Sequence, residues 1–154
     1  MKAKLSESMF KTVVENTPLI AIDLIVENLA GEVLLGRRLN KPAKDYWFIP
    51  GGRIFKSETM SDAFNRLARQ ELNLNLSFDN AVLQGAFEHF YEDSFVDNEI
   101  STHYVVLAYN IFLDIDLNAL PDEQHHCYKW FDKDQLLASD DVHQFTKNYF
   151  QKRK

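Results

Sequence analysis

The sequence predicts an α/β fold in which helices cover both faces of a mixed β-sheet, and three observations support this. Apolar runs of strand length, rich in β-branched and aromatic residues, occupy residues 19–26, 82–91 and 103–113. A segment with the apolar spacing of a helix lies between them, at residues 58–72. Strands that alternate with a few helices and connect partly through hairpins favour a mixed-sheet sandwich.

The N-terminal part of the chain is expected to supply one helix and one hairpin. Residues 6–15 have the spacing of a short amphipathic helix, which Pro18 ends. Residues 19–26 are a strongly apolar strand, and residues 28–31 are typical of a turn. A second strand follows at residues 33–35, so we expect the two strands to pair as a hairpin.

The middle of the chain carries a tight turn directly before a helix. The loop at residues 37–45 is polar and basic, and residues 50–52, a proline and two glycines, predict a turn that exposes main-chain groups. Ser57 is expected to cap the helix at residues 58–72. Asn73 tolerates the left-handed conformation that ends a helix.

The C-terminal half is expected to supply the remaining strands and two helices. Residues 82–91 and 103–113 are long strands, and residues 128–131 are a last short one. Residues 134–137 and 141–150 have helical patterns.

Length and charge limit the classes of function. The 154 residues are enough for one domain with a hydrophobic core, which we expect to span residues 1–154. The net charge of −6 argues against a general nucleic-acid binder but permits a small anionic ligand held by local arginines. The single cysteine, Cys127, excludes an internal disulfide. Residues 19–26 are too few to span a membrane, which takes about 20, so we expect a cytoplasmic protein that binds no membrane.

One carboxylate stands among the apolar residues of the expected helix. Four residues share one side of a helical wheel: Met60, Phe64, Leu67 and Leu72. Glu71 falls inside that sector, where its carboxylate would be partly buried, and burial of an unpaired charge is costly. From the helix alone, two interpretations are open: a structural ion pair with an arginine, or a ligand for a metal ion.

The segment from residue 52 to residue 71 resembles the Nudix box. Four residues stand at the spacings of that pattern: Gly52, Glu58, Arg66 and Glu71. Leu67 and Gln70 stand where the family has Glu. Because those carboxylates hold metal ions in the family, the resemblance implies one metal ion at this site rather than several.

The wider chain resembles the GDP-mannose mannosyl hydrolase branch of the Nudix superfamily. The resemblance is carried by residues 17–19, 23, 25–28, 34–36, 46–48, 50–53, 89–91, 102–107, 121–125 and 137–140. It implies a Nudix α/β/α sandwich, a homodimer, and magnesium-dependent hydrolysis of GDP-mannose, or GDP-glucose, to GDP and the sugar. In this branch water attacks the anomeric carbon with inversion, whereas ordinary Nudix enzymes direct water at phosphorus.

The resemblance also implies the metal ligands and the general base. One Mg²⁺ per subunit, or Mn²⁺ in its place, would be held by the Gly51 main-chain carbonyl, Glu71 and the Gln124 side-chain oxygen. The general base would be His125, and histidine suits that task because its ordinary pKa lies near neutrality. The choice of His125 over His126 rests on the resemblance alone; without it, both would be taken as residues of an exposed polar loop.

Asp23 interrupts an apolar strand, so its neighbours Ile22 and Leu24 should face the other side of the sheet. One interpretation is a satisfied carboxylate at a turn or edge. The other, which the resemblance favours, is an anion that offsets positive charge developing at the anomeric carbon.

The resemblance assigns contacts with the diphosphate or the leaving group to Arg38, Arg53, Arg66 and Tyr104, and stacking on guanine to Phe10. Arginine matches phosphate oxygens well in charge and geometry. Each assignment has a structural alternative. An arginine can be merely solvated, as we expect for Arg37; Arg66 can brace the loop by pairing with Glu58; and Phe10 can simply pack in a core or dimer interface.

Two other functions remain open from the sequence. A Nudix pyrophosphohydrolase would cleave a nucleotide sugar or a nucleoside triphosphate at phosphorus. An inert Nudix-like module would bind a nucleotide without turning it over, and the incomplete box by itself permits this.

Overall fold

A seven-stranded sheet forms the centre of the computed structural model, which describes residues 4–94, 96–121 and 125–152. The helices and strands are α1 (Glu7–Asn16), β1 (Leu19–Glu27), β2 (Val33–Arg38), β3 (Trp47–Phe48), β4 (Gly51–Arg53), α2 (Met60–Leu72), β5 (Val82–Tyr91), β6 (Thr102–Phe112), β7 (His125–Phe131), α3 (Lys133–Ala138) and α4 (Gln144–Asn148). Within these residues, no helix combines the length and apolarity needed to cross a membrane.

Strand β1 is the centre of the sheet and is flanked by different partners along its length. The order is β3-β2-β1-β6-β5, with β4 added to β1 and β7 added to β2. Strand β6 runs parallel to β1 along its whole length, from Leu19 to Glu27. On the other side, β4 pairs antiparallel with Ala21–Asp23, and β2 pairs only at Glu27. The sheet is therefore mixed and forks beside the middle of β1.

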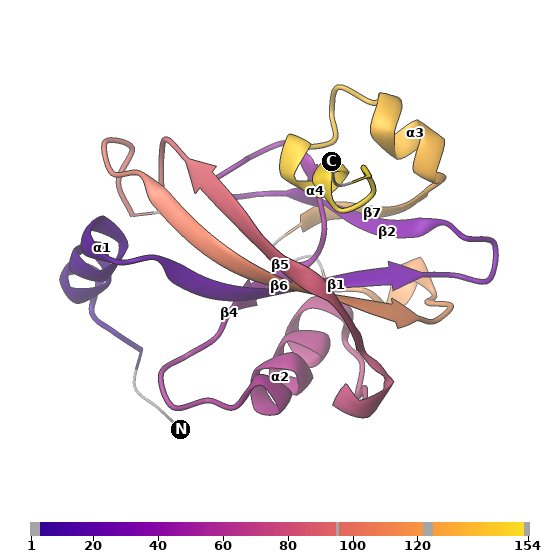
Figure 1. The fold of residues 1–154 in the computed structure, drawn as a ribbon, viewed down its shortest axis with the longest axis horizontal. Coiled ribbons are helices and arrows are strands. Elements are labelled where there is room, and N and C mark those ends of the chain that lie inside the picture. The colour runs from indigo at the N-terminus through magenta and orange to yellow at the C-terminus, as the bar shows by residue number, and fades with distance from the viewer. Residues whose placement is uncertain (1–3, 95, 122–124, 153–154) are drawn as a thin grey trace.

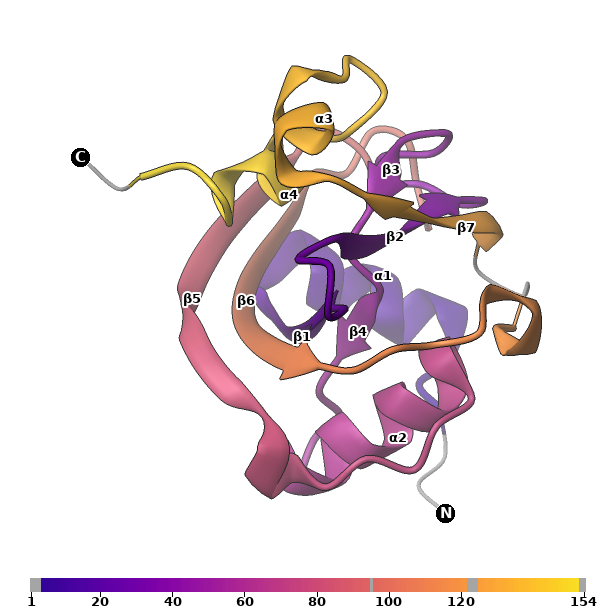
Figure 2. The same cartoon turned by 90° about the vertical axis from the view of Figure 1, so that its right-hand side faces the viewer.

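Helices cover both faces of this sheet, as the sequence predicts. Figure 1 shows α2 on one side of β1 and β6, and α3 and α4 on the other. Figure 2 shows the same two layers from the side. Ile22 and Leu24 pack with Phe64 of α2, whereas Ile25 packs in a second cluster with Leu136 of α3. Successive residues of a strand face opposite sides, so β1 is apolar throughout because both of its faces are buried.

The expected hairpin forms, but its two strands separate almost at once. Glu27 opposite Val33 is the register pair between β1 and β2. Beyond it β2 turns to pair with β7 and β3, while β4 takes its place beside β1. The periodicity of residues 19–26 and 33–35 specified two strands correctly but contained no information on these distant partners.

The start of α2 differs from the prediction in two details. Thr59, not Ser57, is the N-cap, and its hydroxyl accepts a hydrogen bond from the Asp62 main-chain N–H. Ser57 has a φ of 62°, which places it in the preceding loop. Met60 is 49% exposed, although the helical wheel places it on the same side as the buried Phe64 and Leu67. Asn73 ends the helix in the left-handed conformation, as predicted.

The C-terminal helical region is shorter than expected and ends next to the core. Helix α4 covers Gln144–Asn148 within the predicted 141–150 segment. His143 caps it, with ring Nδ1 accepting a hydrogen bond from the Phe145 main-chain N–H. Tyr149 follows the helix directly and is buried in the cluster beneath α3 and α4.

Candidate active site

The fork beside β1 brings Gly51 against Asp23. The two residues are register partners, and the Leu24 main-chain N–H donates to the Pro50 carbonyl oxygen over 2.8 Å. A Cβ atom on Gly51 would overlap with the Ile22 carbonyl oxygen and Oδ1 of Asp23. Only glycine permits this close approach, which places the Gly51 main chain directly beside the buried Asp23 carboxylate.

Asp23 is an almost fully buried carboxylate in the middle of the central strand. It is 7% exposed, and its Oδ2 accepts a hydrogen bond of 2.5 Å from the Tyr149 hydroxyl. Burial raises the pKa of Asp23 to about 7, and the negative charge of Glu71 adds to the increase. The Tyr149 hydrogen bond and the charge of Arg38 act in the opposite direction. Asp23 is therefore not at an edge or a turn: it lies in the central strand, with a paired strand on each side.

Glu71 is the second buried carboxylate and comes from α2. It is 2% exposed, on the face of the helix that also buries Leu67 and Leu72. This confirms the burial that the helical wheel predicts. Its charge raises the pKa of Asp23, so the two carboxylates repel one another. A divalent cation would relieve that repulsion, and carboxylate and carbonyl oxygens are the ligands that Mg²⁺ prefers. The donors present therefore fit the expected ion.

This candidate metal site contains few acidic groups. Among the residues that the structure describes, no group of three or more His, Cys, Asp or Glu side chains gathers in a way that could hold a metal ion. The third expected ligand, Gln124, lies outside the described residues. Glu71 and the Gly51 carbonyl remain the two expected ligands within them.

The two residues that replace acids in the box have other tasks. Leu67 is 2% exposed in the core, and its Cδ2 lies 2.6 Å from where a Cβ of Gly52 would be. Gln70 accepts a hydrogen bond from Nη1 of Arg66 over 3.0 Å. One position fills the core and the other orients an arginine, which leaves Glu71 as the acid of this part of the box.

Arg66 braces the loop before α2. Its Nε and Nη2 donate to the two carboxylate oxygens of Glu58 over 2.7 and 2.9 Å. Nη2 also donates to the Arg53 carbonyl oxygen over 2.7 Å, and the guanidinium lies 4.0 Å from the ring centre of Phe55. The expected structural role of the Glu58–Arg66 pair is thus present. A contact between Arg66 and a leaving group stays a prediction.

Arg53, Phe10 and Tyr104 form one group at the N-terminal end of β1. The Arg53 guanidinium lies 4.1 Å from the ring centre of Phe10 in the same chain. Burial lowers the pKa of Arg53, and the nearby Tyr104 partly offsets this. Burial raises the pKa of Tyr104, while the charges of Arg53 and Arg38 lower it. These three expected substrate contacts are therefore neighbours, although stacking of Phe10 on a base stays a prediction.

Arg38 connects this group to Asp23. Its Nε donates to the Pro42 carbonyl oxygen over 2.9 Å, and its guanidinium carbon lies 5.9 Å from the ring centre of Phe48. Its positive charge affects the pKa values of both Asp23 and Tyr104. Arg37, by contrast, is exposed and donates to the Asp45 carbonyl oxygen. Arg38 is the member of the pair that faces the site.

The two histidines proposed as alternatives for the base open β7. The backbone of His125 is the register partner of Arg38, so β7 begins beside the same end of β2. The side chains of His125 and His126 lie outside the described part of the structure. The assignment of the base to His125 stays a prediction. The main chain of His125 lies beside that of Arg38, which is a residue of the site.

Two buried residues of the site received no role from the sequence. The Tyr149 hydroxyl lies 3.2 Å from Nε2 of His89, which is 3% exposed and stacks on Phe145 with ring centres 4.6 Å apart. The Tyr149 hydroxyl therefore lies between Asp23 and His89 within hydrogen-bond distance of both. Burial lowers the pKa of His89 to about 4, and the nearby His143 contributes. No spacing in the sequence links these residues, which only the folded sheet brings together.

Comparisons with known proteins agree with this architecture. The family model described as NUDIX domain matches residues 17–152. The low-salt glycan biosynthesis protein Agl8 of Haloferax volcanii is 40% identical over 129 residues, which cover 84% of this chain and 80% of that protein. The crystal structure of a MutT NUDIX hydrolase from Burkholderia pseudomallei has a TM-score of 0.71 at 21% identity, over 87% of this chain and 96% of that one.

A further structure, the NUDIX domain of Shewanella oneidensis NrtR complexed with ADP ribose, has a TM-score of 0.60 at 14% identity. The match covers 95% of this chain and 96% of that one. At these sequence identities, the two structural similarities show a shared fold and nothing about function.

Proposed function

The chain belongs to the NUDIX family, and from that premise we propose that it hydrolyses GDP-mannose, or the related GDP-glucose, to GDP and the free sugar. The observation that carries this proposal is that Leu67 and Gln70, which stand where the family has Glu, have structural contacts instead. One fills the core and the other holds Arg66, so Glu71 stands without the neighbouring acids of the usual box. Attack at phosphorus benefits from several carboxylates that hold metal ions and water beside the phosphate. In this chain Leu67 and Gln70 replace two of those carboxylates.

The second carboxylate of the site comes from β1 instead. Asp23 is buried beside Gly51 and lies in the electric fields of Glu71 and Arg38. An anion in this position would offset positive charge at the anomeric carbon as its bond to oxygen breaks. An anion in this position would not assist attack at phosphorus, because the phosphate oxygens already carry negative charge.

Mg²⁺ would be held by the Gly51 carbonyl, Glu71 and Gln124, and it would supply positive charge to the diphosphate. Arg38, Arg53 and Tyr104 would bind the diphosphate, with Arg66 orienting the loop beside it. His125 would take a proton from the attacking water. The water oxygen forms a bond to the anomeric carbon from the face opposite the leaving group, which gives inversion. The bond between that carbon and the phosphate oxygen breaks, and its electron pair leaves with GDP.

The relative from Haloferax volcanii supports the class of substrate. It carries the name of a glycan biosynthesis protein, and sugar nucleotides are the usual activated donors for building glycans. The resemblance to GDP-mannose mannosyl hydrolases further supports GDP as the leaving group, and a homodimer as the assembled form.

Separation of the products tests the proposal. The protein is incubated with GDP-mannose and Mg²⁺, and we expect GDP and mannose. GMP and mannose phosphate would instead identify a pyrophosphohydrolase, and no turnover of any sugar nucleotide would favour the inert binding module. Both results would contradict the proposal.

The metal assignment has a separate test in the Glu71→Gln variant. Because the amide has no charge to hold the ion, we expect the Mg²⁺ concentration for half-maximal activity to rise at least about tenfold. Glu88→Gln is the matched control, since Glu88 is exposed on β5. Unchanged metal dependence in Glu71→Gln would refute the ligand assignment.

A further inference from the structure

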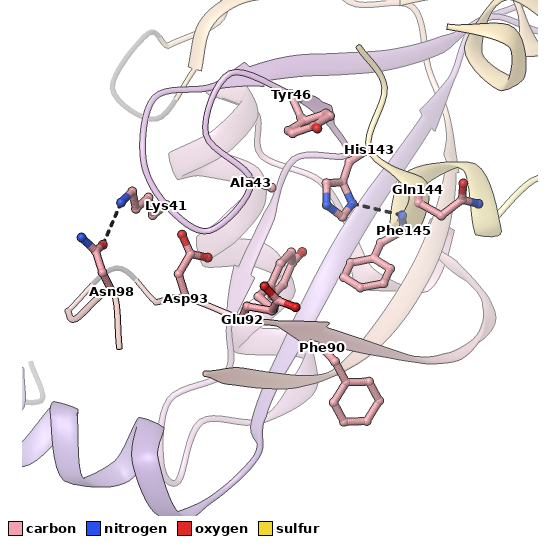
Figure 3. Close-up of a pocket in the computed structure, with 11 residues that line it drawn as sticks. Lys41, Ala43, Tyr46, Phe90, Glu92, Asp93, Asn98, His143, Gln144 and Phe145 are labelled. Carbon is pink, nitrogen blue, oxygen red and sulfur yellow. Dashed lines mark hydrogen bonds between the residues drawn. The ribbon is translucent and has the colours of Figure 1, made fainter. Parts of the chain in front are cut away.

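An open cavity of about 770 Å³ lies beside the candidate active site, between the loop after β2, the end of β5 and the start of α4. Figure 3 shows the side chains that line it, with Tyr46 and His143 above, Phe145 at one side and Glu92 and Asp93 below. None of these five residues received a role from the sequence. The wall therefore combines aromatic rings with two carboxylates.

Tyr91 connects this cavity to the reaction centre. It lines the cavity, and its ring centre lies 6.2 Å from that of Tyr104. Burial raises the pKa of Tyr91, the negative charge of Asp23 raises it further, and Arg38 lowers it. Tyr91 therefore joins the cavity to the surroundings of Asp23, and this adjacency is the reason to assign the cavity to the sugar. Arg53 and Phe10, which adjoin Tyr104, do not line the cavity, so the proposed nucleotide contacts are separate from it.

The cavity wall carries more negative than positive charge. Glu92 and Asp93 contribute two carboxylates. Lys41 contributes one ammonium group, which donates a hydrogen bond of 2.7 Å to Oδ1 of Asn98. His143 adds no positive charge near neutrality, because burial and the nearby Arg38 lower its pKa to about 4.

This combination suits a neutral sugar. Aromatic rings pack on the C–H face of a pyranose, and carboxylate oxygens accept hydrogen bonds from its hydroxyl groups. A sugar that itself carries a carboxylate would meet like charges at Glu92 and Asp93, and like-charge contacts are a common means of rejecting a wrong ligand.

We propose that this cavity is a specificity site at which Glu92 and Asp93 admit neutral hexoses and exclude sugars that carry a carboxylate. The inference rests on the proposed function, because it assumes that a sugar nucleotide is the substrate. It adds which sugars the site accepts and which residues decide this.

The test compares two substrates that differ only at the sixth carbon of the sugar: GDP-mannose and its carboxylate form, GDP-mannuronate. For the unchanged protein we expect kcat/KM to favour GDP-mannose at least about tenfold. In the double variant Glu92→Gln and Asp93→Asn, the ratio should fall at least about tenfold, mainly because GDP-mannuronate is accepted better. Inhibition by GDP alone should be unchanged, and Glu88→Gln, an exposed carboxylate outside the cavity, should keep the original ratio.

Three results would overturn the inference in distinguishable ways. If GDP-mannose is hydrolysed but the ratio is the same in the double variant, the cavity does not select the sugar and the proposed function stands. If the double variant weakens inhibition by GDP, the cavity binds the nucleotide instead. If no sugar nucleotide is turned over by the unchanged protein, the proposed function and this inference both fail.

Discussion

The hydroxyl of Tyr149 donates a hydrogen bond of 2.5 Å to Oδ2 of Asp23 and so ties the end of α4 to the middle of β1. The two residues are 126 positions apart in the chain, and both are buried. Nε2 of His89 lies on the other side of the same hydroxyl. The C-terminal segment thus supports the carboxylate on which the proposed chemistry depends.

Replacement of Tyr149 by Phe should destabilise the protein and impair Asp23. Loss of the hydroxyl leaves a buried carboxylate short of a donor, which costs about 1–3 kcal/mol. We expect a lower free energy of unfolding in urea. Tyr109→Phe is the control, because the hydroxyl of this buried tyrosine faces the Met60 sulfur at 3.9 Å rather than a carboxylate. Equal stability of Tyr149→Phe and Tyr109→Phe would contradict this role of Tyr149.

Asp23 should make the metal-free protein less stable as the pH rises. Its pKa of about 7 in the folded state exceeds the ordinary value of 3.8, so the folded state binds the proton more tightly. The resulting stability is complete below about pH 4 and is lost as the pH rises through about 7, to a limit of about 4 kcal/mol.

Comparison with Asp23→Asn isolates this contribution. His89 has the opposite sign, because its pKa of about 4 is below the ordinary 6.5 and its contribution is lost as the pH falls through that interval. That effect is common to both proteins and cancels in the difference. We expect the stability of the unchanged protein relative to Asp23→Asn to decline between pH 4 and pH 7. A constant difference over this interval would show that Asp23 titrates normally.

The two adjacent glycines should respond differently to a methyl group. In Gly51→Ala the new atom meets main chain at Ile22 and the Asp23 carboxylate, neither of which can move without opening β1 from β4. In Gly52→Ala it meets the end of the Leu67 side chain at 2.6 Å, which can rotate. We expect unfolding measurements to show a loss of about 3 kcal/mol or more for Gly51→Ala and about 1 kcal/mol for Gly52→Ala. The reverse order would contradict the close approach at Gly51.

The adjacent histidines of β7 provide a matched pair for the general base. We expect His125→Gln to lower kcat at least about 100-fold, since loss of a positioned base typically costs this much. His126→Gln should retain kcat within a few-fold, because the resemblance assigns the base to His125 and gives His126 no role. Circular dichroism and thermal unfolding check that both variants fold. A large loss in His126→Gln with little change in His125→Gln would reverse the assignment.

The sequence predicted features that depend on local spacing. The alternation around Asp23, the burial of Glu71 and the left-handed Asn73 each follow from residues within one strand or helix, and the structure confirms all three. The N-cap was predicted at Ser57 and lies at Thr59, because both residues have the required hydroxyl and the loop conformation decides between them.

What the sequence did not predict depends on contacts between distant segments. Tyr149 meets Asp23 only after β1 is placed between its neighbours and α4 packs on its face. The cavity likewise needs Tyr46, Asp93 and Phe145 to converge from three parts of the chain. Periodicity gives the face on which a residue lies but not which distant residue it meets there.

The atom that water attacks is the central claim, and hydrolysis of GDP-mannose in isotope-labelled water tests it most directly. After a single turnover with Mg²⁺, mass spectrometry of both products locates the labelled oxygen. Attack at the anomeric carbon predicts the label in mannose and none in GDP. Label in a phosphate group would show attack at phosphorus and would contradict the proposed roles of Asp23, Leu67 and Gln70.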